Sequence, residues 1–184
     1  MTQAPGARRK FRTITFAVAA MLTSSSLTPA GAQGAALETE IKATYLVKFA
    51  GFIEWPSRLF AGPQSPLVLC IVGPDPFGSL LAEAATGESA GEHPITVRRL
   101  PSAAAVSGCQ IVFAGGSADE VAAALAAVAG KPILTVTDLP QATPIKGIIN
   151  FAVRQGHVRF EIDNRAARHE GLRIDSQLLA LAVP

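Results

Sequence analysis

Residues 66–78 read Pro-Leu-Val-Leu-Cys-Ile-Val-Gly-Pro-Asp-Pro-Phe-Gly, an apolar run that ends in a turn rich in glycine and proline. An apolar run of this length without polar alternation is typical of a strand buried on both faces, as in a parallel sheet. A helix is expected over Phe77–Ala85, directly after the turn. A buried strand followed by a helix predicts an α/β fold.

The same alternation continues on both sides of this stretch. Further strands are expected at Ile95–Leu100, Cys109–Ala114 and Ile133–Val136, and a helix capped by Ser117 is expected over Ala118–Ala129. A long amphipathic helix precedes the first strand, with a shared face made of Leu37, Ile41, Tyr45, Lys48, Phe49, Phe52 and Ile53. Glu54-Trp55-Pro56 should close that helix, because a residue before proline avoids the helical conformation.

The last third of the chain changes character. Two strands, Gly147–Val153 and His157–Asp163, are separated by Arg154-Gln155-Gly156, which predicts a β-hairpin. One or two helical turns over Arg165–His169 and a capped C-terminal helix over Asp175–Leu181 complete the chain. The whole pattern predicts a single α/β domain with a mixed sheet of parallel strands plus a C-terminal hairpin, and helices on both faces.

The second hairpin strand alternates cleanly between apolar and polar residues. Its apolar members should face the core, while the opposite face carries His157, Arg159, Glu161 and Asp163. We call these four residues the polar stripe. Its spacing could place a carboxylate and an imidazole around one ion, but a solvated outer face of the sheet explains the same pattern more simply.

Residues 1–32 have the features of a cleavable signal peptide. Arg8, Arg9, Lys10 and Arg12 precede an uncharged stretch that is shorter than the ~20 apolar residues needed to span a bilayer, and Ala30-Gly31-Ala32 supplies small residues for cleavage after Ala32. Arg8-Arg9-Lys10-Phe11 also resembles a twin-arginine signal, so the Sec and Tat routes both stay open. The mature domain, residues 33–184, is therefore expected in the periplasm, without insertion into the membrane.

Charge and cysteine content narrow the function of this mature domain. Without the leader, 12 Lys and Arg remain against 14 Asp and Glu, so the net charge is −2, and nucleic-acid binding is not expected. Cys70 and Cys109 are the two cysteines of the chain. An even count in an oxidising compartment predicts a disulfide, although two buried thiols would fit the sequence as well.

No residue pattern predicts catalysis, a cofactor or a metal. His93, His157 and His169 lack the i, i+4 spacing of zinc hydrolases. The loops Gly73–Gly78 and Gly115–Ser117 precede helices, but prolines in the first and acidic residues after the second make both poor phosphate sites. We therefore expect a protein that is not an enzyme.

Several motifs, in order along the chain, resemble the YfiR family of periplasmic proteins. They are Lys42-Ala43-Thr44-Tyr45-Leu46, Lys48-Phe49-Ala50, Phe52-Ile53-Glu54-Trp55-Pro56, Leu67–Gly73, Asp75-Pro76-Phe77-Gly78, Gly108–Phe113, Ile133–Asp138, Ile149-Asn150-Phe151, Val158–Ile162 and Leu172–Leu179. The resemblance covers essentially the whole mature domain. Two departures are that Leu139–Gly147 has no aromatic residue and that Lys146 stands where the family often has a glycine.

The resemblance implies a negative regulator that binds the periplasmic sensor region of an inner-membrane diguanylate cyclase, and so limits cyclic di-GMP signalling and biofilm formation. It also implies a homodimer, makes an outer-membrane lipoprotein a candidate further partner, and pairs Cys70 with Cys109. The alternative is a periplasmic small-ligand sensor for another membrane signalling protein, using the polar stripe or the loop Leu139–Gly147. A hydrolase or metalloenzyme ranks last.

We expect the partner-binding residues to come from the polar stripe and from two aromatic or apolar regions. The expected set is Trp55, His157, Arg159, Glu161, Asp163, Gln177 and Leu178. Trp55 fits two roles, because it could plug the gap between helix and sheet or line a groove for a partner, where Trp is often a binding hot spot.

Overall fold

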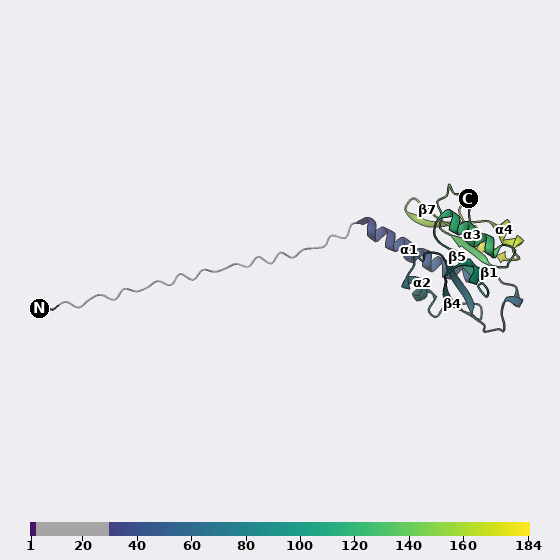
Figure 1. Ribbon diagram of the computed structural model, residues 1–184, viewed down its shortest axis with the longest axis horizontal. Helices are drawn as coiled ribbons and strands as arrows, with labels where there is room; N and C mark the ends of the chain where they lie inside the picture. Colours follow the sequence, from purple (N-terminus) through teal and green to yellow (C-terminus); the bar gives the residue numbers. More distant parts are fainter. Residues whose placement is uncertain (3–29) are drawn as a thin grey trace.

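The structure is a computed structural model that describes residues 1–2 and 30–184 (Figure 1). The predicted signal peptide falls almost entirely on residues 3–29 and so lies outside the described residues. The predicted cleavage site after Ala32 falls in the first turn of helix α1, Ala30–Lys48. Among the residues that are described, no helix combines the length and the apolar composition needed to cross a bilayer.

Seven strands form the main sheet, in the order β3-β4-β2-β5-β6-β7-β8. Their bounds are β2 Leu67–Val72, β3 Ser89–Ala90, β4 His93–Leu100, β5 Ile111–Ala114, β6 Leu134–Thr137, β7 Ile149–Arg154 and β8 His157–Ile162. Neighbours from β4 to β7 are parallel, whereas β3 and β8 pair antiparallel at the two edges. The five parallel strands follow the order of flavodoxin-like, doubly wound folds. The predicted mixed sheet with a C-terminal hairpin is confirmed.

The apolar run Leu67–Val72 forms the central strand β2, paired with β4 on one side and β5 on the other. Leu67, Leu69 and Ile71 contribute to the core on one face of the sheet, and Cys70 and Val72 to the core on the other face. Burial on both faces explains why the strand shows no polar alternation.

Helices cover both faces of the sheet, as predicted. Helices α1 and α2 (Ser79–Ala85) bury residues in the core of what we call the first face, and α3 (Ala118–Val128) packs on the second face. The shorter elements are α4 Asn164–His169, α5 Ser176–Leu181 and the 3-10 turns η1 Phe49–Phe52, η2 Ser57–Leu59 and η3 Ala103–Ala105. The C-terminus lies beside β7, where Arg154 donates a hydrogen bond to the Pro184 carbonyl (Figure 1).

The first helix ends earlier than predicted. It stops at Lys48, continues as η1, and leads into a short strand β1, Ile53–Glu54, which pairs antiparallel with β9, Arg173–Ile174. Gly51 weakens the helix in this stretch, and the backbone groups of Ile53 and Glu54 find partners in β9 instead of in a further helical turn. Strands of two residues are too short to produce a periodic pattern.

The buried face of α1 is also broader than the predicted one. Leu37 and Lys48 are exposed, whereas Ala43, Leu46 and Val47 are buried. The reason is that α1 packs against both the sheet and α2, so more of its circumference is covered.

Two other boundaries have local causes. Helix α2 begins at Ser79 and not at Phe77, because the Phe77 N–H donates to the Asp75 side chain in a turn before the helix. The hairpin between β7 and β8 has a two-residue turn, Gln155-Gly156, with φ values of 54° and 74°. Two consecutive left-handed residues are the signature of the tight type I′ hairpin turn.

Candidate functional site

The polar stripe lies on the second face of the sheet. Val158 and Phe160 are buried in the core of the first face, so the intervening residues His157, Arg159 and Glu161 point to the opposite side. His157 and Arg159 are exposed there. The predicted alternation of this strand is therefore confirmed.

Within the stripe, Glu161 is the centre of a network of hydrogen bonds and ion pairs. Its two oxygens accept bonds from Lys146 Nζ at 2.6 Å and Gln141 Nε2 at 2.8 Å, and Arg154 Nη2 lies 3.4 Å away. The bond from Lys146 lowers the pKa of the Glu161 carboxyl, and the nearby positive charges outweigh the opposing effect of burial. Glu161 is thus already satisfied within the chain.

The last member of the stripe, Asp163, caps helix α4. Its Oδ1 accepts hydrogen bonds from the backbone N–H groups of Arg165 and Ala166, both at 2.9 Å. A side chain that caps a helix has a structural role without any partner.

The other expected partner-binding residues do not join the stripe. Trp55 packs against the core of the first face and donates a 3.3 Å hydrogen bond to the Ala50 carbonyl. Gln177 is exposed on α5, but Leu178 is buried, with 3% of its surface exposed. The expectation that Leu178 belongs to an exposed contact surface is wrong, because α5 uses this side chain to close the core. The expected set is divided between the two sides of the sheet.

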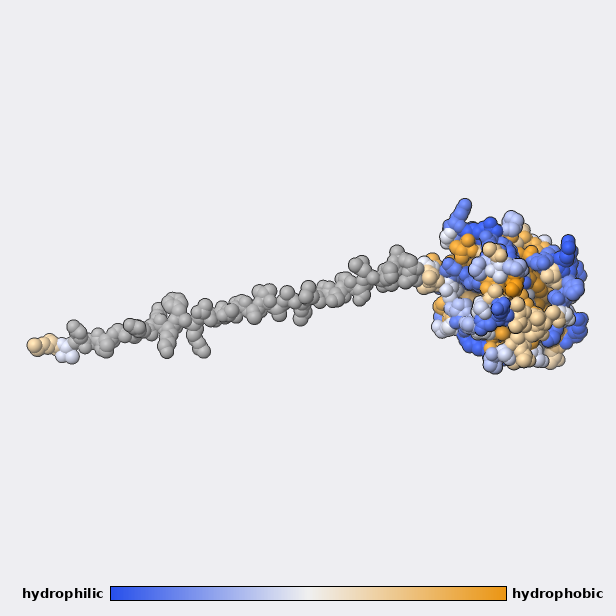
Figure 2. All heavy atoms as spheres, turned by 45° about the horizontal axis from the view of Figure 1, so that its top comes forward, coloured by the Kyte–Doolittle hydropathy of each residue, from blue (hydrophilic) through white to orange (hydrophobic). Residues whose placement is uncertain are grey.

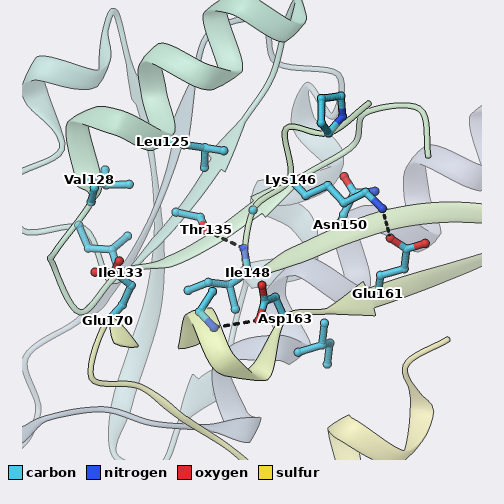
Figure 3. Close-up of a pocket in the computed structure, with 15 residues that line it drawn as sticks. Leu125, Val128, Ile133, Thr135, Lys146, Ile148, Asn150, Glu161, Asp163 and Glu170 are labelled. Carbon is cyan, nitrogen blue, oxygen red and sulfur yellow. Dashed lines mark hydrogen bonds and ion pairs between the residues drawn. The ribbon is translucent and has the colours of Figure 1, made fainter. Parts of the chain in front are cut away.

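A cavity of about 450 Å³ opens on the second face, next to the stripe (Figure 3). Helix α3 and strand β6 form one side of the cavity, and the segment before β7, the end of β8 and helix α4 form the other. Glu161 and Asp163 contribute to its wall from the stripe, and Lys146 from the loop that departs from the family pattern. No local pattern in the sequence predicts this cavity, because its lining comes from several elements that lie apart in the chain.

In doubly wound sheets, ligands commonly bind where the strand order reverses, here between the carboxyl ends of β2 and β5. In this chain the two loops at that point touch each other. A Cβ atom at Gly73 would lie 2.4 Å from the Gly115 carbonyl oxygen, and one at Gly115 would lie 2.4 Å from the Pro74 carbonyl oxygen. The usual ligand crevice of the fold is therefore narrowed by direct contact between backbones.

Helix α3 follows the loop that contains Gly115. The hydrogen-bonding groups at its N-terminus are bonded within the chain. Ser117 accepts a bond from the Glu120 N–H, and the Glu120 carboxylate accepts bonds from the Ser117 N–H and hydroxyl. These bonds lower the pKa of Glu120. A capping box that supplies its own anion is a poor site for a phosphate, which agrees with the interpretation of this loop from the sequence.

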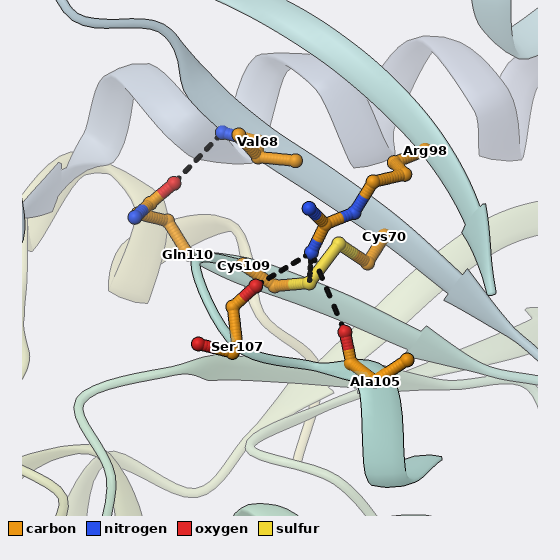
Figure 4. The surroundings of a disulfide bond; sticks show 7 residues. All are labelled: Val68, Cys70, Arg98, Ala105, Ser107, Cys109 and Gln110. Carbon is orange, nitrogen blue, oxygen red and sulfur yellow. Dashed lines mark hydrogen bonds between the residues drawn. A yellow bond between two sulfur atoms is a disulfide. The ribbon is translucent and has the colours of Figure 1, made fainter. Parts of the chain in front are cut away.

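The predicted disulfide is present. Cys70 and Cys109 are bonded, with their Cα atoms 5.9 Å apart, inside the core of the second face. Arg98 Nη2 lies 3.2 Å from the Cys109 sulfur and donates a 2.7 Å hydrogen bond to the Ser107 carbonyl (Figure 4). The bridge links the central strand to the loop before β5.

The three histidines lie apart from one another. His93 stacks on Phe60, with ring centroids 3.7 Å apart, and its Nδ1 lies 2.7 Å from the Ser65 carbonyl oxygen. His157 and His169 are exposed. Within residues 1–2 and 30–184, no three His, Cys, Asp or Glu side chains are arranged to hold a metal ion.

A buried lysine with two acidic partners was not predicted from the sequence. Lys42, on α1, is 7% exposed, and its Nζ contacts Glu38 Oε1 at 2.6 Å and Asp138 Oδ2 at 2.7 Å. Burial lowers the pKa of Lys42, but the bonds and charges of Asp138 and Glu38 outweigh that effect and raise it overall. The position of Lys42 between apolar residues of the predicted helix was the sequence feature that could have indicated its burial.

These features define a disulfide-bonded α/β domain with several ion pairs, one of which is partly buried. The YfiR/HmsC-like family model matches residues 39–183, so the chain belongs to this family. No curated protein matches the chain. The family is periplasmic, regulatory and non-catalytic, and membership supports a role as a regulator of diguanylate cyclase signalling.

Proposed function

We propose that this protein is a negative regulator that binds the periplasmic sensor region of an inner-membrane diguanylate cyclase and so lowers cyclic di-GMP. The observation that carries the proposal is the family match, which spans residues 39–183 and therefore every strand of the sheet and all of the domain except the first half of α1 and Pro184. The disulfide supports a cross-linked domain that acts by contact with its partner.

The polar stripe offers one contact surface. Arg159 and His157 are exposed on the second face, and Arg159 donates a hydrogen bond only to the carbonyl of its neighbour Val158 among the described contacts. Figure 2 shows hydrophilic and hydrophobic residues interspersed on one side of the domain, the composition of an ordinary protein surface and of many non-obligate interfaces. We assign direct contact to His157 and Arg159, and a supporting role to Glu161 and Asp163.

The test of this function is co-purification with the periplasmic part of a diguanylate cyclase from the same organism, together with cellular cyclic di-GMP. Arg159→Glu should weaken binding at least about ten-fold, since reversing a charge in a complementary interface is costly. Lys131→Glu, at an exposed lysine outside both the stripe and the surface of Trp55, is the matched charge reversal and should bind normally. A cyclase that is not retained by the unchanged protein, with cyclic di-GMP unaltered on deletion, would refute the proposal.

Trp55 and Gln177 offer a second surface, on the other side of the sheet. Trp55→Ala distinguishes packing from binding, because loss of thermal stability indicates a core role and an unchanged melting curve with lost binding indicates a groove. The half-buried position of Trp55 leads us to expect both effects, with lower stability as the larger one.

We also propose that the protein forms a homodimer and that an outer-membrane lipoprotein is a second partner, as the family resemblance suggests. Sedimentation equilibrium of the purified protein tests the homodimer. A binding assay with a candidate lipoprotein, with and without the cyclase, tests the second partner. A monomer at all concentrations would contradict the proposed homodimer, and a lipoprotein that does not bind would contradict the proposed second partner.

A further inference from the structure

Strand β8 is the last strand of the main sheet, so one of its edges faces away from β7. The Asp163 N–H donates to the Ile148 carbonyl at 2.8 Å, and in an antiparallel pair the backbone groups of alternate residues point toward the neighbouring strand. The odd-numbered residues of β8 therefore bond to β7, while the N–H and C=O groups of Val158, Phe160 and Ile162 point outward. An edge of this kind is a template for pairing with another chain.

The segment after α5, residues 182–184, covers this edge incompletely. The Val183 N–H donates to the outward Phe160 carbonyl at 2.9 Å, and the Arg159 side chain donates to the outward Val158 carbonyl at 3.1 Å. In the part of the chain that the structure describes, no backbone or side-chain acceptor bonds to the three outward N–H groups. The edge thus keeps hydrogen-bonding groups for a further strand.

The side chains of the polar stripe carry opposite charges on the two sides of Phe160. His157 and Arg159 precede it, and Glu161 and Asp163 follow it. When a second copy of β8 pairs antiparallel with the first about Phe160, residue 159 of one copy lies opposite residue 161 of the other, and residue 157 lies opposite residue 163. These are the non-hydrogen-bonded pairs of the ladder, in which opposed side chains lie closest. Each basic side chain therefore meets an acidic one.

The same pairing also matches the apolar side chains and the backbone. Phe160 lies opposite its own copy, and Val158 lies opposite Ile162. These three residues carry the outward backbone groups, so each outward N–H donates to a carbonyl of the other copy. Parallel pairing in register would instead bring like charges together, which is unfavourable. The charge pattern therefore favours antiparallel pairing of two copies.

From these observations we infer that two copies of the protein associate through antiparallel pairing of their β8 strands about Phe160, with Arg159 of each copy facing Glu161 of the other. The interface is isologous, because the same surface is used on both copies. The inference deepens the homodimer proposed above by giving it an interface, and it rests on that proposal.

Pairing changes two contacts of the single chain. Val183 leaves the Phe160 carbonyl, and Arg159 leaves the Val158 carbonyl and turns to the carboxylate of the other copy. Glu161 keeps its bonds to Lys146 and Gln141, because a carboxylate accepts several hydrogen bonds at once.

The test is sedimentation equilibrium of the purified protein and of charge variants. Arg159→Glu should weaken the dimer at least about ten-fold, because residues 159 and 161 of opposite copies then carry like charges. Glu161→Arg should weaken it for the same reason. Glu92→Arg, at an exposed glutamate beside β4 on the opposite edge of the sheet, is the matched control and should associate normally. A dimer that Arg159→Glu leaves intact would overturn this interface, and the proposed homodimer would stand.

Mixing the two variants separates charge pairing from a loss of folding. In a dimer of one Arg159→Glu copy and one Glu161→Arg copy, opposite charges face each other at both positions. An equimolar mixture should therefore form mixed dimers about as tightly as the unchanged protein does. Native mass spectrometry identifies these dimers, because the two variants differ in mass. A mixture that stays monomeric, with both variants folded by circular dichroism, would refute the inference.

Val183→Pro tests the covering segment, because it removes the N–H that bonds to the Phe160 carbonyl. Pairing then no longer breaks this bond, so the dimer should tighten at least about five-fold, as expected for one net hydrogen bond. A weaker dimer would contradict pairing at this edge. A monomer in both the unchanged protein and this variant would contradict the homodimer and the interface together. The cyclase proposal is untouched by any of these results, because no cyclase is used.

Discussion

Lys42 is a buried charged residue that has two acidic partners. Its ammonium reaches Glu38 one turn earlier in α1 and Asp138 at the carboxyl end of β6. Lys42 and Asp138 are far apart in the sequence, so their ion pair holds helix α1 against the sheet. The value of such a pair depends on keeping both partners, because removal of one leaves a buried charge.

Asp138→Asn should therefore lower the free energy of unfolding by about 1–3 kcal/mol, since the Lys42 ammonium keeps only Glu38 as a charged partner. Urea denaturation at neutral pH measures this loss. The control is Glu88→Gln in the exposed Lys48–Glu88 pair, whose loss should cost less than about 1 kcal/mol. Equal losses in the two variants would show that burial of Lys42 adds nothing.

The same pair gives a pH dependence at the alkaline end. Because the pKa of Lys42 is raised above its ordinary value of 10.5, its contribution to stability is complete below pH 10.5 and is lost as the pH rises through the higher value in the folded protein. The stability difference between the unchanged protein and Lys42→Met should therefore shrink above pH 10.5 and stay constant between pH 7 and 9. A difference that changes within that lower range would contradict this assignment.

Glu161 gives the opposite dependence at the acidic end. Its pKa is lowered from the ordinary value of 4.5, so its contribution to stability is present above pH 4.5 and is lost as the pH falls through the lower value in the folded protein. Lys146→Met should cost less than about 1 kcal/mol at pH 7, because Lys146 is partly exposed, and progressively less as the pH falls below 4.5. Denaturation curves at pH 7, 5, 4 and 3 measure the trend, and a cost that grows on acidification would refute it.

At the scale of the element, α3 is the helix whose start the sequence predicts best. Ser117 followed three residues later by Glu120 is a local signal, and both reciprocal bonds of the capping box are present. By contrast, α1 continues as a 3-10 turn and a strand because β9, more than 100 residues away, supplies backbone partners. Local signals predict caps and turns, but pairing between distant segments decides where such a helix ends.

Ser117→Ala should lower the free energy of unfolding by about 1 kcal/mol, since it removes the side chain that accepts the Glu120 N–H. Thermal unfolding followed by circular dichroism measures the effect. Ser102→Ala is a matched control, because Ser102 also occupies an N-cap position, before η3, but makes no side-chain cap bond. A Ser102→Ala variant as unstable as Ser117→Ala would show that the capping bonds are not the cause.

At the scale of the whole molecule, the disulfide joins residues 39 positions apart in sequence. In the chain-entropy model, closing a loop of about 40 residues stabilises the folded state by about 4 kcal/mol. The bond is also buried in the core of α3 and the central strands, so its loss affects packing on that entire face.

A Cys70→Ala, Cys109→Ala double variant should consequently be less stable than the oxidised protein by about 4 kcal/mol. Urea denaturation of the two proteins, each with and without a reducing agent, measures the loss. Reduction should lower the stability of the unchanged protein and leave the double variant as it was. A reducing agent that destabilises both equally would show that the effect does not come from this bond.

Local patterns were enough to predict the α/β class, the central strand, the hairpin and the alternation of β8, because each depends on periodicity, turn residues or composition within a short segment. The division of Trp55, Gln177 and the polar stripe between two sides of the sheet follows from how the distant segments pack. So do the burial of Lys42 and Leu178, and the cavity on the second face. These features arise where segments far apart in sequence pack together, and no local pattern records which distant side chains will meet.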